Sequence, residues 1–397
     1  MAKILPGSPK GRSVILHPGK DRAIKNRHHW IFSGAVKSLP DFDDGSLLTV
    51  RSAEGELLGT AYFNRRSSII GRMVSFDETA PLEAIERNID RALALRRTFS
   101  SVETNALRLV NGEGDSLPGL IVDRYNDVLV LQVSTLGMER LKPFVVETLA
   151  KKLSPRSIYE KSNLASRREE GLDDAEGVLA GEAAERVEIL ESGLRFIVDL
   201  VHAQKTGFYL DQKENRRFVE SLARGRRVLN CFSYTGAFSV FALRGGALSA
   251  KNVDASQPAM EIAKDNFLLN GYETGDDDFH TADVFDFLRR NKIPQDFVIL
   301  DPPAFAKKRG EVVQACRGYK DIHRIVFQKL PRGSLVLTFS CSYFVGEDLF
   351  RKVVFQAACE ASRDVRLLAR HRQTYDHPIN IYQPESDYLK GFLLYVD

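Results

Sequence analysis

The chain has 397 residues, of which 43% are hydrophobic and 27% are charged, which is the composition of a soluble globular protein. This length exceeds one ordinary hydrophobic core, so we expect two or three domains. No apolar run reaches the roughly 20 residues that span a bilayer, and the N-terminus lacks the apolar core of a signal peptide. We therefore expect a cytoplasmic protein with no membrane partner.

The four cysteines form no CxxC pair and no cluster with histidine at zinc spacing, so we expect neither a structural metal site nor a disulfide framework. The net charge of +3 is too small to indicate nucleic-acid binding by itself. Residues 1–37, however, contain Asp21 as their single acid among many lysines and arginines. This basic module is either a phosphate-facing surface or a solvated face, and composition leaves both open.

In chain order, the first elements are short apolar runs separated by turn signals, at 13–16, 47–50, 57–63 and 68–74. This spacing predicts a small β-barrel or compact sheet. Residues 77–81 form a boundary, and Pro81 begins a helix because Leu82, Ile85 and Ile89 follow at helical spacing. The middle segment has strand-like runs at 106–110, 120–123 and 128–133 and a helix through 141–149, which indicates a mixed α/β unit.

A hairpin pattern over 187–198 introduces the last domain, in which strands and helices alternate. Such alternation predicts a doubly wound parallel sheet covered on both faces. In these sheets the ligand lies beyond the carboxyl ends of the strands. The expected strands are 228–232, 250–254, 297–300 and 334–339, and the expected helices include 238–244 and 257–269.

Polar residues follow these strand ends. Asn230–Phe238 contains Gly236 at the mouth of a helix, where the backbone can approach a ligand, although a plain turn is about equally consistent. Asp254 ends the next strand, where an acidic side chain commonly binds a ribose. Asp283 is a candidate for the adenine amino group or for a helix N-cap, and the two roles can coexist.

The last two strands end in Asp301-Pro302-Pro303 and in Ser340-Cys341-Ser342. Two prolines stiffen the chain into a platform against which a flat base can be held. An unplaced cysteine is usually a small packed hydrophobe, which is our interpretation of Cys231, Cys316 and Cys359. Cys341 differs because it lies just past a strand end on the ligand side.

These motifs together resemble the YccW/RlmI-type family of 23S rRNA cytosine-5 methyltransferases over nearly the whole chain. The strings that carry the resemblance are His17-Pro18-Gly19, 29–36, 108–115, 118–125, 204–216, Asp376-His377-Pro378 and 388–392. The first two are similar to the family's PUA domain, a small RNA-binding barrel. The implied fold is α/β, with a PUA β-barrel (1–76), a small α+β middle domain (77–190) and a Rossmann-like class I methyltransferase domain (191–397).

The resemblance implies S-adenosylmethionine as cofactor and cytosine C5 of rRNA, from the 23S molecule, as acceptor. Because C5 is a weak nucleophile, a thiolate must first add to C6, which makes C5 carbanion-like. Cys341 is the expected nucleophile. Asp301 is expected to hydrogen-bond the ring N3 or, alternatively, to assist the cofactor. The base that removes the C5 proton stays unassigned, and a homodimer stays open.

The expected contacts form two sets. The cofactor set is Phe208, Asp211, Gln212, Asn230, Phe232, Ser233, Tyr234, Gly236, Asp254, Ala255, Ser256, Asp283, Val284, Asp301 and Pro302. The RNA set is Arg22, Lys25, His29 and Trp30.

The chain also departs from the family pattern. Ala237 and Ala203 stand where glycines are expected, which cofactor binding tolerates if the local φ is negative. Residues 379–387 differ from the family's usual loop, which concerns the acceptor site. Two alternatives remain: a methyltransferase of the same fold acting on another RNA nucleoside or a small molecule, and a non-catalytic RNA-binding factor. The Asp-Pro-Pro and Cys341 motifs favour the cytosine-5 enzyme, because nitrogen-directed methylation needs no cysteine adduct.

Overall fold

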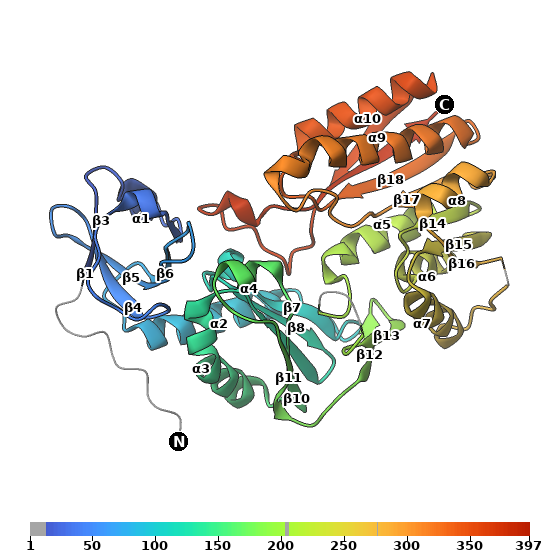
Figure 1. Ribbon diagram of the computed structural model, residues 1–397. Coiled ribbons are helices and arrows are strands. Elements are labelled where there is room, and N and C mark those ends of the chain that lie inside the picture. The colour runs from blue at the N-terminus through green and yellow to red at the C-terminus, as the bar shows by residue number, and fades with distance from the viewer. Residues whose placement is uncertain (1–12, 203–205, 276) are drawn as a thin grey trace. The chain divides into compact units, whose positions relative to one another are not determined.

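The computed structural model describes residues 13–202, 206–275 and 277–397 (Figure 1). The chain divides into two compact units. The first unit runs to Ile189 and includes the later segments Val198–Phe208 and Tyr375–Ser386. The second unit contains Leu190–Ile197, Tyr209–Thr374 and Asp387–Asp397. The domain boundaries expected from sequence stay a prediction, and Ala203 lies outside the described residues.

The N-terminal part of the first unit is a six-stranded sheet in the order β2-β6-β5-β4-β1-β3. Alternate residues of β1 and β4, such as Val14, Leu16, Leu48 and Val50, point into a common core because successive side chains of a strand face opposite sides. The strands are β1 (Ser13–Leu16), β2 (Trp30–Ile31), β3 (Val36–Ser38), β4 (Leu47–Arg51), β5 (Leu57–Phe63) and β6 (Gly71–Ser75), with helix α1 (Arg22–Lys25) between the first two.

A second, five-stranded sheet in the order β11-β10-β9-β8-β7 completes this unit. Helix α2 (Pro81–Thr98) begins at Pro81, as predicted, and buries Ile85 and Ile89. These side chains share one core with Tyr62 and Val74 of the first sheet, so both sheets pack around it. The remaining elements are β7 (Ala106–Asn111), β8 (Leu120–Tyr125), β9 (Val128–Val133), α3 (Leu136–Leu153), β10 (Ser157–Ser162), α4 (Ala165–Glu169) and β11 (Ala175–Gly181).

The second unit is built on a seven-stranded sheet in the order β16-β15-β14-β17-β18-β20-β19. A two-stranded hairpin, β12 (Arg186–Glu191) and β13 (Leu194–Asp199), precedes it in the chain. The strands are β14 (Arg227–Cys231), β15 (Ser249–Asp254), β16 (Phe279–Thr281), β17 (Phe297–Leu300), β18 (Ser334–Ser340), β19 (Val365–His371) and β20 (Lys390–Val396).

Helices cover both faces of this sheet (Figure 1). One face carries α8 (Val284–Arg290), α9 (Val312–Lys329) and α10 (Glu347–Ala361), and the other carries α5 (Lys213–Leu222), α6 (Ala237–Arg244) and α7 (Gln257–Leu269). The prediction of a fully parallel sheet was wrong at one edge, because β20 runs antiparallel to both β18 and β19. No crossover helix joins β19 to β20, and parallel neighbours need such a connection.

Among the helices that the structure describes, none has the length and apolar character needed to cross a membrane. Ala237 begins α6 and is absent from the described non-glycine residues with positive φ, so the alanine fits where a glycine was expected.

Candidate active site

Three neighbouring strands bring the sequence motifs to one edge of the sheet. Strands β14, β17 and β18 are parallel neighbours, with Cys231 opposite Leu300 and Leu300 opposite Thr338. The residues that follow these ends therefore gather at the same edge, which is where the sequence predicted the ligand.

The turn after β14 has an unusual backbone. Phe232, Tyr234 and Gly236 all have positive φ, at 59°, 48° and 75°. The amide of Tyr234 donates to the Asp254 carboxylate at 2.9 Å, which ties this turn to the end of β15. A Cβ at Gly236 would approach the Cβ of Ala263 to 3.1 Å, so helix packing and conformation both favour glycine. Left-handed residues in such succession form a concave backbone suited to ligand binding.

The hydrogen bonding of polar atoms at this turn indicates whether a cofactor could bind there. Among the residues that the structure describes, Asn230 Oδ1, Ser233 Oγ and Thr235 Oγ1 are buried without a hydrogen-bond partner. Buried polar atoms in native proteins are nearly always paired, so a polar ligand is the expected partner. The Asp254 carboxylate lies at the next strand end and also accepts from Ser256 at 2.9 Å. This donor and acceptor set fits a nucleoside-containing cofactor.

The other expected cofactor residues lie in several places. Ser256 caps α7 by accepting from the Ala259 amide, and Ala255 beside it is exposed. Asp283 is exposed and accepts from the Asp286 amide at 2.9 Å, which confirms its N-cap role. Val284, the next residue, is buried in the core.

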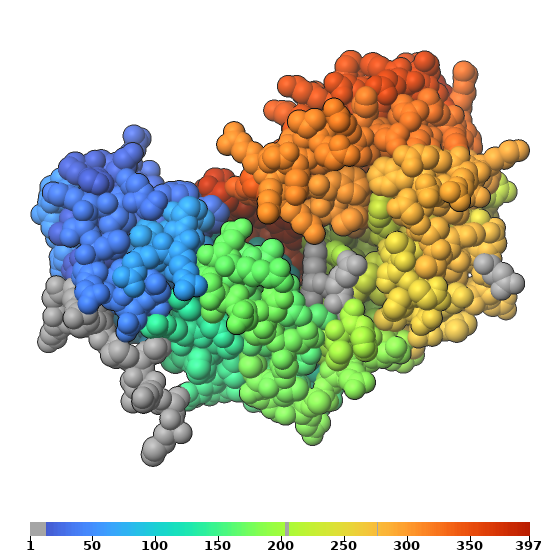
Figure 2. Space-filling view, in the orientation of Figure 1, coloured from blue at the N-terminus to red at the C-terminus, as the bar shows by residue number. Residues whose placement is uncertain are grey.

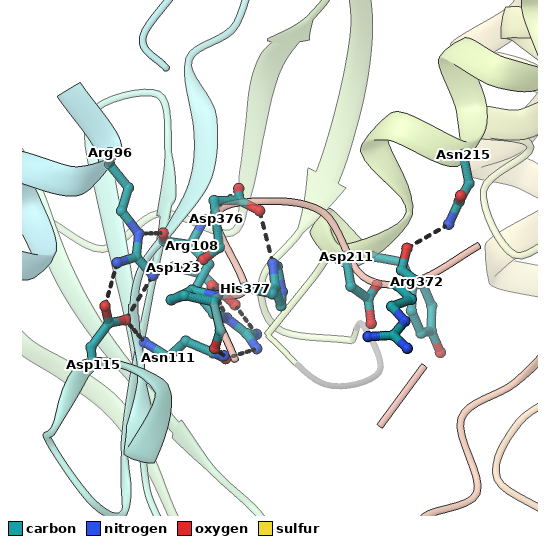
Figure 3. A network of polar contacts seen from close by, with 12 residues as sticks. Arg96, Arg108, Asn111, Asp115, Asp123, Asp211, Asn215, Arg372, Asp376 and His377 are labelled. Carbon is teal, nitrogen blue, oxygen red and sulfur yellow. Dashed lines mark hydrogen bonds and ion pairs between the residues drawn. The ribbon is translucent and has the colours of Figure 1, made fainter. Parts of the chain in front are cut away.

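Asp211 and Gln212 begin the second unit's first helical turn. Tyr388 donates its hydroxyl proton to Asp211 Oδ2 at 2.7 Å, which fixes that carboxylate. Gln212 accepts from Asn215, whose amide also donates to the Arg372 carbonyl (Figure 3). Phe208 belongs to the first unit, where its amide donates to the Tyr125 hydroxyl at 3.1 Å.

A buried tyrosine holds both serines that flank Cys341. The hydroxyl of Tyr319, on α9, lies 3.0 Å from Ser340 Oγ and 3.1 Å from Ser342 Oγ. Ser342 Oγ also accepts from the Ala306 amide at 3.2 Å, so the same hydroxyl fixes the chain beyond Asp301-Pro302-Pro303. The Cys341 thiol lies 3.8 Å from the Pro302 carbonyl oxygen. The two motifs are therefore fixed side by side.

A buried lysine adds positive charge beside the thiol. Lys390 begins β20 opposite Ser340, and its Nζ donates to the carbonyls of Ser342 and Tyr388 at 2.8 and 2.7 Å. Burial lowers the pKa of Lys390, while the negative charges that Cys341 and Asp387 can carry act in the opposite direction. Attraction of this kind is reciprocal, so the ammonium favours the thiolate form of the cysteine.

Tyr209 is electrostatically coupled to the centre of the site. Burial raises the pKa of Tyr209, and the negative charges of Asp301, Asp211, Cys341 and Asp254 raise it further. These four groups therefore lie close enough to Tyr209 to act on its hydroxyl electrostatically. The ring of Tyr209 also packs edge-on against Tyr234 of the turn, with centroids 5.2 Å apart.

Sequence reasoning missed Tyr319, Lys390 and Tyr209 as functional candidates. Tyr209 and Lys390 lie inside the strings 204–216 and 388–392, which resemble the family's motifs. That resemblance was the one feature of the sequence that could have indicated a role for them. Tyr319 lies in a long helix with no signal of its own.

The other cysteines are packed or remote from these strand ends. Cys231 is fully buried, and burial raises the pKa of its thiol. Cys316 lies in α9, where burial also raises its pKa, and Cys359 is exposed on α10. Within the described part of the chain, no group of three metal-binding side chains occurs.

The expected RNA contacts differ in exposure. Arg22 and Lys25 are exposed, although Lys25 pairs with Asp21 and Glu56 at 2.9 and 2.7 Å. Trp30 is half-buried. His29 is only 1% exposed, and its Nδ1 lies 2.9 Å from the Met73 carbonyl oxygen. A ring so enclosed does not reach a surface that RNA could contact, so the predicted contact at His29 does not fit the structure.

A buried polar network in the first unit joins two of the strings that carry the family resemblance, 108–115 and Asp376-His377-Pro378 (Figure 3). Arg96 pairs with Asp115 and also donates to the Asp376 carbonyl at 2.7 Å. The Arg108 amide donates to the Asp376 carboxylate at 3.2 Å, while its guanidinium pairs with Asp123. The motif around Asp376 therefore anchors Tyr375–Ser386 to the middle sheet.

Two family models match the chain. Residues 157–374 match S-adenosylmethionine-dependent methyltransferases, and residues 14–76 match a PUA-like domain. The crystal structure of SMU.776, described as a putative methyltransferase complexed with SAH, superposes on this chain with a TM-score of 0.84 at 25% identity. The match covers 96% of this chain and 99% of the other. The fold and site define a methyltransferase that uses S-adenosylmethionine and carries a PUA-like domain, which confirms the predicted fold class and cofactor.

Curated relatives define the family more closely. The proteins named ribosomal RNA large subunit methyltransferase I from Shewanella denitrificans and Pseudoalteromonas translucida are each 40% identical over 389 residues. Each match covers 96% of this chain and 98% of the relative. The chain belongs to the family that these relatives form, which confirms the resemblance inferred from its motifs.

Proposed function

We propose that this protein methylates C5 of a cytosine in 23S rRNA and that Cys341 forms a covalent adduct with the base. The names of the relatives support ribosomal RNA of the large subunit as the substrate. The choice of cytosine C5 as the acceptor atom rests on Cys341. Methylation of a ring nitrogen or an amino nitrogen needs no cysteine nucleophile, whereas methylation of C5 does.

The observation that carries the proposal is the position of the Cys341 thiol. It lies past the end of β18, 3.8 Å from the Pro302 carbonyl oxygen, and between serines that Tyr319 holds in place. The Lys390 ammonium beside it favours the nucleophilic thiolate. The other three cysteines lack this combination of strand-end position and charge.

The proposed steps conserve atoms and electrons. The Cys341 thiolate adds to C6 of the cytosine, and the electron pair of the 5,6 double bond shifts so that C5 becomes nucleophilic. S-adenosylmethionine would supply an electrophilic methyl group, whose bond to the sulfonium sulfur breaks with the electron pair staying on sulfur, so that S-adenosylhomocysteine leaves. After C5 accepts the methyl group, a base removes the C5 proton, the double bond re-forms and the thiolate leaves. Asp301 is the candidate for hydrogen bonding to ring N3, which stabilises the adduct.

A trapping experiment tests this mechanism. RNA containing 5-fluorocytidine should form a denaturation-resistant complex with the protein, because fluorine cannot leave as a proton does and elimination stalls. Mass spectrometry should locate the bond at Cys341. Cys341→Ala should abolish both the adduct and methyl transfer, while calorimetry shows retained cofactor binding.

Cys359→Ala is the matched control, because Cys359 is exposed on α10 and should leave methyl transfer unchanged. Robust turnover by Cys341→Ala would refute the covalent mechanism. Methylation that appears on another nucleoside, with no adduct, would favour the alternative of a same-fold enzyme with a different acceptor atom.

A further inference from the structure

Aromatic side chains line one side of β2 and its flanks. His28, Trp30 and Phe32 occupy alternate positions, which face the same side of an extended chain. Their neighbouring rings meet edge-on, with centroids 5.8 Å apart for His28 and Trp30 and 6.3 Å apart for Trp30 and Phe32. Phe32 is 50% exposed, so this aromatic row reaches the surface.

A pocket of about 590 Å³ adjoins this row and shares His28 with it. Its lining includes Lys25, Asn26 and Arg27, at the end of helix α1 and just beyond it, and also Ile381 and Tyr382 of the segment Tyr375–Ser386. In Figure 2 this red segment lies against the blue N-terminal sheet. The volume falls within the range of sites that hold small molecules or single nucleotides.

The loop that contributes Ile381 and Tyr382 is firmly held. The His29 amide donates to the Gln383 side chain at 3.0 Å, and Glu385 lies 3.3 Å from the His28 ring. Yet Ile381 is 85% exposed and Tyr382 is 51% exposed. A fixed loop that presents an aliphatic and an aromatic side chain beside cations has the chemistry of a surface for unpaired bases, which stack on apolar rings while their phosphates meet basic groups.

We propose that this pocket and the aromatic row bind an unpaired RNA segment, with one base against Tyr382 and its neighbours along His28, Trp30 and Phe32. Arg27 supplies positive charge for the phosphates. The proposal rests on RNA being the substrate. The proposal also gives a function to residues 379–386, where this chain departs from the family's usual loop. These residues would determine which nucleotide the pocket accepts.

Trp30 is the single tryptophan of the chain, so its fluorescence reports on this site directly. Titration of the full-length protein with an eight-nucleotide oligo(rA) should quench Trp30 emission. Tyr382→Ala should weaken binding roughly 5- to 30-fold, because stacking of a base on an aromatic ring is lost. Tyr382→Phe keeps the ring and should bind within about twofold of the wild type.

Val102→Ala is the matched control, since Val102 is a 97% exposed aliphatic residue of the same unit, and its binding should be unchanged. A duplex RNA of equal length should bind more weakly than the single strand, since its bases are not free to stack. Equal affinity of Tyr382→Ala and wild type, or a preference for duplex, would overturn the proposal. If the oligomer binds as expected while no RNA is methylated, the proposed function fails and this site stands.

Discussion

Acid should destabilise the second unit through His323, a residue directly beneath the candidate active site. His323 lies on α9 and is fully buried, with Nδ1 2.6 Å from the Tyr319 carbonyl and Nε2 2.8 Å from Thr338 Oγ1. Burial lowers its pKa from 6.5 to about 4. The neutral imidazole thus joins α9 to β18, the strand that ends at Cys341.

The sign and size of the effect follow from proton linkage. Between pH 6.5 and about 4 the unfolded chain binds a proton at this position that the folded chain does not, so the free energy of unfolding falls as the pH falls through this window. A difference of about 2.5 pKa units at 1.36 kcal/mol per unit corresponds to about 3 kcal/mol. This contribution is complete above pH 6.5 and lost near pH 4.

His323→Gln isolates this contribution, because glutamine does not titrate and retains an amide that can bond to Thr338. Urea unfolding followed by circular dichroism at several values between pH 7 and pH 4 gives the stability of both proteins. The wild type should lose about 3 kcal/mol more than the variant across this range. Parallel losses in the two proteins would refute the assignment of the acid sensitivity to His323.

Three further variants test contacts in the second unit. Lys390→Met should slow iodoacetamide modification of Cys341 near neutral pH by roughly tenfold, measured by site-resolved mass spectrometry; an unchanged rate would remove the ammonium from the mechanism. Tyr319→Phe removes the hydroxyl that contacts Ser340 and Ser342, and should lower the free energy of unfolding in urea by about 1–3 kcal/mol. It should also lower kcat more than it raises the KM for the cofactor; a normal kcat would show that the Tyr319 hydroxyl is not needed to position Cys341. Arg216→Met leaves Glu191 as an uncompensated buried charge and should cost about 3–5 kcal/mol of unfolding free energy, and a loss below 1 kcal/mol would contradict this.

The sequence predicted the parts of the site that follow strand ends. The turn at Gly236, Asp254, the Asp-Pro-Pro platform and Cys341 all lie directly after buried apolar runs, and local patterns of that kind are visible in a sequence. Parallel pairing then places them at one edge without further information. The same reasoning identified α2 from Pro81 and the spacing of the apolar residues that follow it.

Contacts between distant parts of the chain were beyond such reasoning. Lys390 reaches the active-site edge only because β20 inserts between β18 and β19, and local periodicity does not reveal strand order. Tyr319 is one of many buried residues of an amphipathic helix, and its hydroxyl contacts depend on side-chain geometry. His29 was misjudged because a histidine within a basic segment does not reveal whether its ring faces the core or the solvent.

The anchoring of Tyr375–Ser386 through Asp376 has a consequence for biosynthesis. Arg96 and Arg108 bond locally to Asp115 and Asp123, but their shared partner Asp376 follows them by 280 and 268 residues and is therefore synthesised much later. Closing such a long loop is slow compared with forming local contacts. The first unit therefore stays incompletely bonded while strands β14 to β19 are synthesised, so its last contacts form only after much of the second unit has left the ribosome.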